Sequence, residues 1–189
     1  HSTGILGPEG KGTAAHFGLQ VDILTSTLGK SLGGAAGGFV AAAQPVIDML
    51  RQRSRPYLFS NALPPAIIGG ALEAIKLTRN GDDLRTRLQA NAAHFRAGLS
   101  AAGFNLLDGQ HPIIPVMLGE GQLAQDMASR LYDLGVYVTG FFYPVVPLGQ
   151  ARIRTQMSAA LTTDQLDQAI EAFTPVSYTH LTLPTRCLG

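Results

Sequence analysis

The stretch that decides the fold reads Thr25-Ser26-Thr27-Leu28-Gly29-Lys30-Ser31-Leu32-Gly33-Gly34. It follows an apolar run at residues 21–24, so we predict a strand that leads into a glycine-rich turn carrying one lysine, Lys30. An amine in such a turn can form a Schiff base with an aldehyde cofactor. The Thr27 hydroxyl and the backbone amides that the glycines leave open can face a phosphate. The pattern alone also describes other phosphate loops and plain tight bends, so further residues have to decide.

The composition is that of a globular protein. Hydrophobic residues make up 46% and charged residues 14% of the 189 residues, whereas a disordered chain would be more charged and less apolar. The net charge of +1 gives no reason to expect nucleic acid or a membrane surface as a partner. A single cysteine excludes an internal disulfide framework. Because the first residue is His1, we expect the native N-terminus, with any targeting segment, to be missing.

Hydrophobic periodicity and turn residues predict alternating strands and helices, which is typical of an α/β chain. Residues 1–17 are expected to form a loop, and residues 55–61 an extended segment, since the residue before a proline is usually extended. The strands are expected at residues 20–26, 39–42, 113–118, 136–138 and 151–156. The helices are expected at residues 44–53, 66–78, 82–102, 122–134 and 162–173.

The same pattern divides the chain into three parts. Residues 1–80 form one region and residues 81–176 a compact α+β lobe. Residues 177–189 break the period of the preceding helix and resemble sequencing-adapter DNA translated in frame. We therefore expect this tail to be non-native and exclude it from the fold.

Two further groups of polar residues are candidates for binding. Arg152 and Arg154 lie on one short predicted strand, and we expect them to point to opposite faces, one toward a cleft and one toward solvent. A guanidinium can hold a carboxylate by two parallel hydrogen bonds, although solvent-facing charges on an edge strand are an equal alternative. Phe59-Ser60-Asn61 precedes a predicted helix, where such residues favour an anion or simply cap the helix.

Three longer strings of residues identify a family. Residues 51–61 (RQRSRPYLFSN), 138–147 (VTGFFYPVVP) and 149–160 (GQARIRTQMSAA), together with Thr27 and Lys30, resemble the α-oxoamine synthases, fold-type I enzymes that use pyridoxal 5'-phosphate (PLP). The resemblance covers residues 1–176. It implies an α/β chain that is the C-terminal part of a fold-type I PLP-dependent transferase. Residues 1–80 would be a partial large domain with a mixed sheet, and residues 81–176 a smaller α+β C-terminal lobe.

The resemblance also implies residues that contact the cofactor. Lys30 matches the lysine that binds the cofactor aldehyde and acts in catalysis. Thr27 matches the hydroxyl near the cofactor phosphate. His1 matches a histidine that contacts the phenolic oxygen of the cofactor, and we expect it to be a second catalytic residue.

Other matched residues imply a partner subunit and a substrate. Phe59 and Ser60 match residues that reach the phosphate in the neighbouring subunit, which implies a homodimer with shared active sites. Arg154 matches the arginine that binds the carboxylate of the amino-acid substrate. The chain also departs from the family, since it lacks the aspartate three residues before His1 and carries Leu161 where relatives usually have histidine.

Within the family, the long strings are most similar to members that condense glycine with acetyl-CoA. The resemblance thus implies formation of 2-amino-3-oxobutanoate and CoA, or the reverse reaction in threonine degradation. Alternatives are 5-aminolevulinate synthase, 8-amino-7-oxononanoate synthase or serine palmitoyltransferase activity, or an inactive truncated fragment. The expected location is the cytoplasm of a bacterium or the mitochondrion of a eukaryote. No metal site is expected, because the histidines show no ligand spacing.

Overall fold

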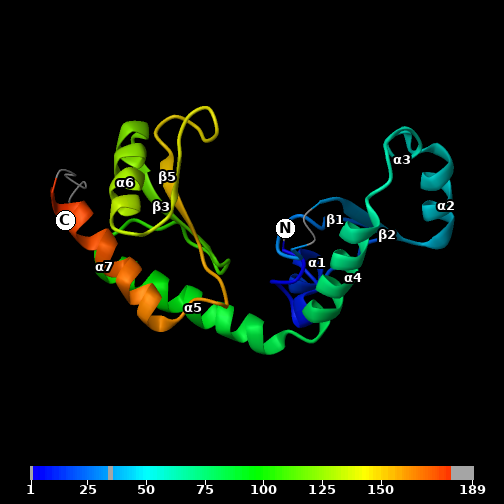
Figure 1. Ribbon diagram of the computed structural model, residues 1–189, viewed down its shortest axis with the longest axis horizontal. Coiled ribbons are helices and arrows are strands. Elements are labelled where there is room, and N and C mark those ends of the chain that lie inside the picture. The colour runs from blue at the N-terminus through cyan, green and yellow to red at the C-terminus, as the bar shows by residue number, and fades with distance from the viewer. Residues whose placement is uncertain (1, 34–35, 180–189) are drawn as a thin grey trace. The chain divides into compact units, whose positions relative to one another are not determined.

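The computed structural model describes residues 2–33 and 36–179. The chain divides into two compact units, His1–Arg85 (unit 1) and Thr86–Gly189 (unit 2). Figure 1 shows the β1–β2 pair in unit 1, and α6 and α7 beside the strands of unit 2. The division falls within one helix, α5 (Asp82–Ala101).

Unit 1 is built from one strand pair and several helices. Strand β1 (Ile23–Thr27) pairs antiparallel with β2 (Gly38–Ala42), in a register that sets Thr27 opposite Gly38. The sequence led us to expect a mixed sheet here. In the described part of unit 1, the structure has this antiparallel pair of strands. The helices are η1 (Pro8–Gly10), α1 (Thr13–His16), α2 (Gln44–Arg53), α3 (Arg55–Phe59) and α4 (Pro65–Arg79).

Two predictions for unit 1 were wrong. The expected loop at residues 1–17 contains the short helices η1 and α1. The segment predicted to be extended, 55–61, begins with helix α3. Proline is tolerated in the first turn of a helix, where its missing N–H has no helical partner. Pro56 occupies that turn, and the extended residue is Ser54, the N-cap, with ψ of 109°.

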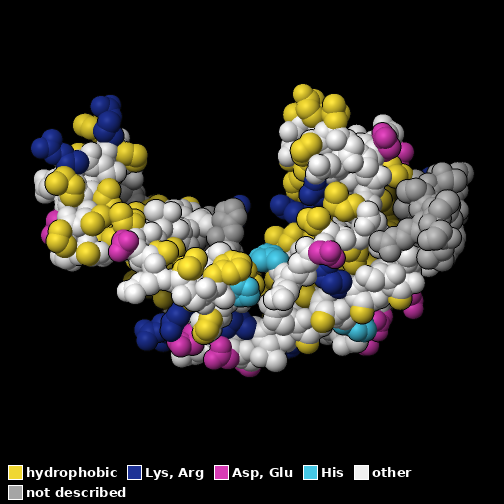
Figure 2. Space-filling view, turned by 180° about the vertical axis from the view of Figure 1, so that it is seen from behind, with side chains coloured by type: hydrophobic (Ala, Val, Ile, Leu, Met, Phe, Trp, Pro, Cys, Tyr) yellow, Lys and Arg dark blue, Asp and Glu magenta, His cyan; other side chains and the backbone are white. Residues whose placement is uncertain are grey.

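Unit 1 buries few of its apolar side chains. Its buried cluster consists of Leu28, Leu32 and Ala71, with Phe39 and Leu63 packed against it. Contiguous exposed apolar surface usually marks a contact with other protein, and Figure 2 shows hydrophobic side chains on this unit, with Lys and Arg gathered at its α2–α3 end. The exposed large hydrophobic residues of unit 1 are Phe17, Leu19, Val21, Ile23, Val40, Met49, Tyr57, Leu58, Phe59, Ile68, Leu72, Ile75, Leu77 and Leu84.

Unit 2 is a three-stranded antiparallel sheet with helices on one face. The strands β3 (Ile113–Gly119), β4 (Thr139–Phe141) and β5 (Ala151–Gln156) are ordered β3-β5-β4. Side chains from α5, α6 (Gly121–Asp133) and α7 (Thr163–Thr179) join the inner-facing residues of β3 and β5 in one buried cluster. The opposite face of the sheet carries the more exposed residues of β5.

The strand predicted at residues 136–138 begins three residues later, at Thr139. The cause is the end of α6, which closes in a Schellman motif. Gly135, with φ of 82°, donates its N–H to Tyr132 O, and the Val136 N–H bonds to Leu131 O at 2.8 Å. The N–H groups of Gly135 and Val136 are hydrogen-bonded to the end of α6. The backbone therefore pairs with β5 only beyond these residues, from Thr139 onward.

The core of unit 2 is centred on aromatic side chains. Phe173 is fully buried and meets Phe95 and Phe104 edge to face, with ring centroids 6.1 and 5.6 Å apart. We expect Phe173→Ala to lower the free energy of unfolding by about 3–5 kcal/mol, since it removes transfer energy and leaves a cavity. The exposed neighbour Glu171 supplies the control, and Glu171→Ala should stay within about 0.5 kcal/mol of wild type. Urea unfolding of both variants is the measurement, and equal losses would contradict this account of the core.

A half-buried histidine should make unit 2 sensitive to acid. Burial lowers the pKa of His111 below 6.5, and its Nδ1 accepts the Ile113 N–H at 3.1 Å, a bond that only the neutral ring can form. Because the folded-state pKa lies below the unfolded one, the stabilisation is present above pH 6.5 and is lost as the pH falls through the folded-state pKa. We expect His111→Asn to flatten the fall in unfolding free energy between neutral and mildly acid pH. An unchanged pH profile in that variant would rule His111 out as the cause.

Candidate active site

The turn that carries Lys30 is fixed by a buried leucine on each side. Leu28 and Leu32 are 5% and 4% exposed, whereas Lys30 between them is exposed. The Gly33 N–H bonds to Lys30 O at 3.0 Å, and the Leu28 N–H bonds to Gly37 O at 2.9 Å. The two leucines thus hold the backbone while the amine is left accessible. Within the described residues no carboxylate forms an ion pair with it.

The Thr27 hydroxyl lies at the start of this turn. Its Oγ1 accepts the Gly29 N–H at 3.2 Å and donates to Gly37 O at 3.4 Å. The donated bond is long and therefore weak. To donate to a phosphate instead, the hydroxyl would have to give up only this weak bond.

Thr3, near the start of the chain, forms hydrogen bonds with residues on both sides of the Lys30 turn. Its Oγ1 lies 2.9 Å from Ser26 Oγ, and its carbonyl accepts the Ser31 hydroxyl at 2.5 Å. The segment that follows His1 therefore packs against the Lys30 turn. The predicted site residue His1 itself lies outside the described residues. Roles for Thr3, Leu28 and Leu32 were not predicted from the sequence, although the apolar residues two positions either side of Lys30 were a visible signal.

Phe59 and Ser60 lie elsewhere in unit 1, at the end of α3. Both residues are exposed, and Phe59 is 78% accessible. The Arg55 guanidinium carbon lies 5.5 Å from the centroid of the Phe59 ring, one helical turn away. No hydrogen bond within the described chain joins either residue to the Lys30 turn. Their exposure fits residues that contact something other than this unit.

Arg154 lies on β5 in unit 2, on the exposed face of the sheet. The prediction that Arg152 and Arg154 point to opposite faces was wrong, because residues two apart on a strand share a face. Buried residues alternate with them at Ala151, Ile153 and Thr155. Arg152 donates to Gln150 through both Nε (3.0 Å) and Nη2 (3.2 Å).

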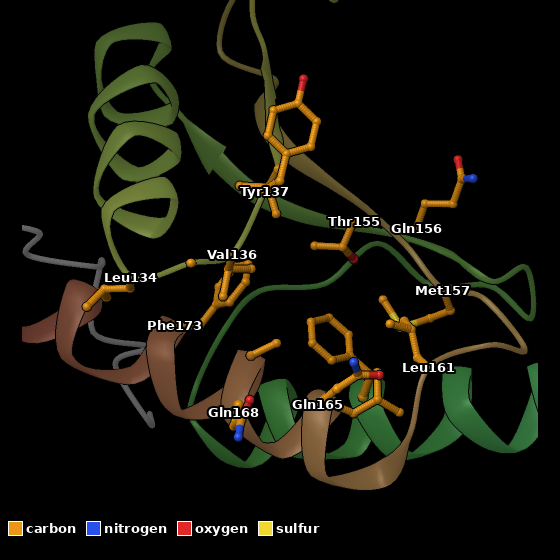
Figure 3. Close-up of a pocket in the computed structure, with 15 residues that line it drawn as sticks. Leu134, Val136, Tyr137, Thr155, Gln156, Met157, Leu161, Gln165, Gln168 and Phe173 are labelled. Carbon is orange, nitrogen blue, oxygen red and sulfur yellow. The ribbon is translucent and has the colours of Figure 1, made fainter.

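Unit 2 also contains a cavity of about 410 Å³ between β5 and α7. Figure 3 shows the Gln156 amide and the Tyr137 hydroxyl directed away from α7. No lysine, arginine, histidine or carboxylate lines this cavity, and its Thr155 hydroxyl already donates to Ile114 O. A phosphate or carboxylate would find no counter-charge there, so the cavity is not the site that the sequence predicts.

The described residues provide neither a cluster of metal ligands nor a membrane-spanning helix. Within residues 2–33 and 36–179, no three His, Cys, Asp or Glu side chains are placed to hold a metal ion. In the same part of the chain, no helix has both the length and the apolar character needed to cross a membrane.

Comparison with known proteins identifies the family. The family described as aminotransferase class I and II matches residues 1–173. This chain belongs to that family. Its fold-type I class and its resemblance to the α-oxoamine synthases are thereby confirmed, both by relatives and by solved structures.

Several relatives of this family member carry one name. The 2-amino-3-ketobutyrate coenzyme A ligase of Escherichia coli K12 is 54% identical over 178 residues, which are 93% of this chain and 45% of that protein. The mitochondrial enzyme of the same name from Mus musculus is 47% identical over 186 residues, 97% of this chain and 45% of that protein. The chain therefore spans less than half the length of these curated relatives.

Solved structures agree with this fold. An SPT structure with a PLP internal aldimine superposes with a TM-score of 0.89 at 33% identity, covering 94% of this chain and 45% of that one. The 8-amino-7-oxononanoate synthase of Francisella tularensis gives a TM-score of 0.80 at 32% identity, covering 93% of this chain and 52% of that one.

Proposed function

We propose that this chain is the C-terminal part of a PLP-dependent glycine C-acetyltransferase. The enzyme condenses glycine with acetyl-CoA to 2-amino-3-oxobutanoate and CoA, or runs in reverse during threonine degradation. The observation that carries the proposal is the 54% identity to the E. coli ligase, in a chain whose Lys30 amine is exposed between two buried anchors.

The residues present fit the cofactor. Lys30 offers an accessible primary amine, and Thr27 a hydroxyl whose donated bond is weak. We propose that Lys30 holds the cofactor aldehyde, Thr27 faces its phosphate and His1 its phenolic oxygen. When bound, PLP supplies an electron sink for negative charge that develops on the amino-acid Cα.

The chain's own residues account for substrate binding and proton transfer. Arg154 binds the glycine carboxylate through its guanidinium donors. The Lys30 amine takes the proton from glycine Cα as general base. A C–C bond then forms between that carbon and the acetyl carbonyl, the C–S bond of the thioester breaks, and the CoA thiolate takes up a proton as it leaves.

The partners follow from the same assignment. We propose a homodimer in which the exposed Phe59 and Ser60 reach the phosphate in the other subunit's site. Because unit 1 leaves most of its apolar side chains exposed, we propose that the chain alone is inactive. The enzyme would be cytoplasmic in a bacterium and mitochondrial in a eukaryote, as the mouse relative's name indicates for that protein.

A second candidate is 8-amino-7-oxononanoate synthase activity. It is favoured by the relative of that name from Treponema denticola, which is 39% identical over 173 residues. Both reactions form a C–C bond from the amino-acid Cα to the acyl carbonyl and release CoA. They differ in the amino acid, in the length of the acyl group, and in that formation of 8-amino-7-oxononanoate also releases the amino-acid carboxylate as CO2, whereas 2-amino-3-oxobutanoate keeps it.

The test uses the full-length protein with glycine, alanine and serine, each against acetyl-CoA and longer acyl-CoAs. We expect CoA release to be fastest with glycine and acetyl-CoA. Preference for alanine with a longer acyl-CoA would establish the second candidate instead. Turnover by a soluble, monodisperse preparation of the 189-residue chain would contradict the proposal that it is inactive alone.

A further inference from the structure

The strand beside Arg154 brings an aromatic ring to the exposed face of the sheet. In the antiparallel register of β4 and β5, Thr139 lies opposite Arg154 and Phe141 lies opposite Arg152. Phe141 is thus the diagonal neighbour of Arg154 on one face, a position within reach of long side chains. The pairing brings together residues that are far apart in the sequence.

The contact between these two side chains is close. The Arg154 guanidinium carbon lies 4.5 Å from the centroid of the Phe141 ring, well inside the distance of about 6 Å at which a cation is attracted by a ring face. Arg152, directly opposite the ring, is instead hydrogen-bonded to Gln150. The Phe141 ring therefore contacts the guanidinium of Arg154.

The ring itself is held in place. Its neighbour Gly140 lies so close to α6 that an added Cβ would come within 2.9 Å of Ala124 O. This close approach fixes β4 against α6, and Phe141 is half-buried beside it. A half-buried ring on a packed strand can orient a guanidinium that would otherwise move freely in solvent.

A ring orients the arginine without competing for its ligand. A carboxylate partner would occupy the guanidinium N–H groups and neutralise their charge. Among residues 2–33 and 36–179, no carboxylate forms an ion pair with Arg154. The ring attracts the cation electrostatically and leaves the N–H donors available to an incoming carboxylate.

We propose that Phe141 is a positioning residue for substrate binding, which holds the Arg154 guanidinium in the orientation that receives the amino-acid carboxylate. This inference rests on the proposed function, because that function assigns the carboxylate to Arg154. Phe141 acts through Arg154 and need not touch the substrate.

The test is a set of variants in the full-length protein. Phe141→Leu keeps apolar bulk and removes the ring, and we expect it to raise the KM for glycine about 3- to 10-fold, as a lost cation–π contact predicts. The kcat and the KM for acetyl-CoA should be unchanged. Phe141→Tyr keeps the ring face and should behave as wild type. The matched control is Phe142→Leu. Phe142 is the adjacent aromatic residue, and its side chain lies against Gly121 at the start of α6. This variant should also leave glycine binding unchanged.

A double-mutant cycle separates positioning from general destabilisation. In the Arg154→Ala background, Phe141→Leu should add no further increase in the KM for glycine. Calorimetric titration with glycine in the absence of acetyl-CoA should show the same pattern in Kd.

The outcomes that overturn the role are distinct. An unchanged KM for glycine in Phe141→Leu, an equal rise in the KM for acetyl-CoA, or an effect that persists without Arg154 would overturn it while leaving the proposed function intact. A wild-type protein that turns over no amino acid with any acyl-CoA would overturn the proposed function and this role together.

Discussion

Replacement of Lys30 by alanine is expected to lower turnover of the full-length protein by about 1000-fold or more. The amine is proposed both to hold the cofactor and to take the Cα proton, and loss of a general base alone costs about 100- to 10,000-fold. The visible absorbance of the lysine-bound cofactor should disappear at the same time. Because Lys30 is exposed and its turn is held by Leu28 and Leu32, the variant should unfold at the same urea concentration as wild type.

Lys76→Ala is the matched control for this experiment. Lys76 is an exposed lysine of unit 1 that forms a surface ion pair with Glu73 at 3.4 Å, a contact worth little to stability. Its removal should leave both turnover and absorbance unchanged. Near-normal turnover in Lys30→Ala would remove the central assignment of the active site.

Replacement of Arg154 by alanine has the second largest expected effect. Loss of hydrogen bonds between charged partners costs about 1.5–3 kcal/mol, so the KM for glycine should rise roughly 10- to 100-fold. The KM for acetyl-CoA should change far less, because the guanidinium is assigned to the amino-acid carboxylate only. Arg154→Lys should recover part of the loss, since lysine keeps the charge without the planar pair of donors.

The neighbouring arginine provides the control for Arg154. Arg152 lies on the same strand face and differs in that its guanidinium is already bonded to Gln150. Arg152→Ala should leave the KM for glycine near the wild-type value. If the two alanine variants have equal effects, the face as a whole contributes charge and neither arginine is a specific carboxylate ligand.

Elements with local signals were predicted well. The strand at residues 151–156 matches β5, and the helices predicted at 82–102 and 122–134 match α5 and α6 to within a residue. These segments are long and periodic, or bounded by glycine, so their own residues determine them. Helix α3 and the start of β4 were missed, because a proline in a first helical turn and a Schellman helix end both override the local pattern.

The candidate site was predicted only as far as it depends on motifs. Lys30 and Thr27 lie in a recognisable turn, so their chemistry could be proposed from sequence. The contact between Phe141 and Arg154 depends on the register of two strands that are distant in sequence, and register is set by the hydrophobic face and the intervening turn. The apolar residues on either side of Lys30 are visible in the sequence, but their burial against α4 is a tertiary contact that the local pattern does not specify.

The β1–β2 pair has a consequence for how this chain can be handled. Within the described residues the two strands bond only to each other, so each keeps an outer edge of unpaired N–H and C=O groups. Neither strand contains a charged residue or a proline, which are the features that usually keep edges from adding further strands. We expect copies of the isolated chain to join edge to edge, at a rate set by concentration. Dilution should therefore slow this association.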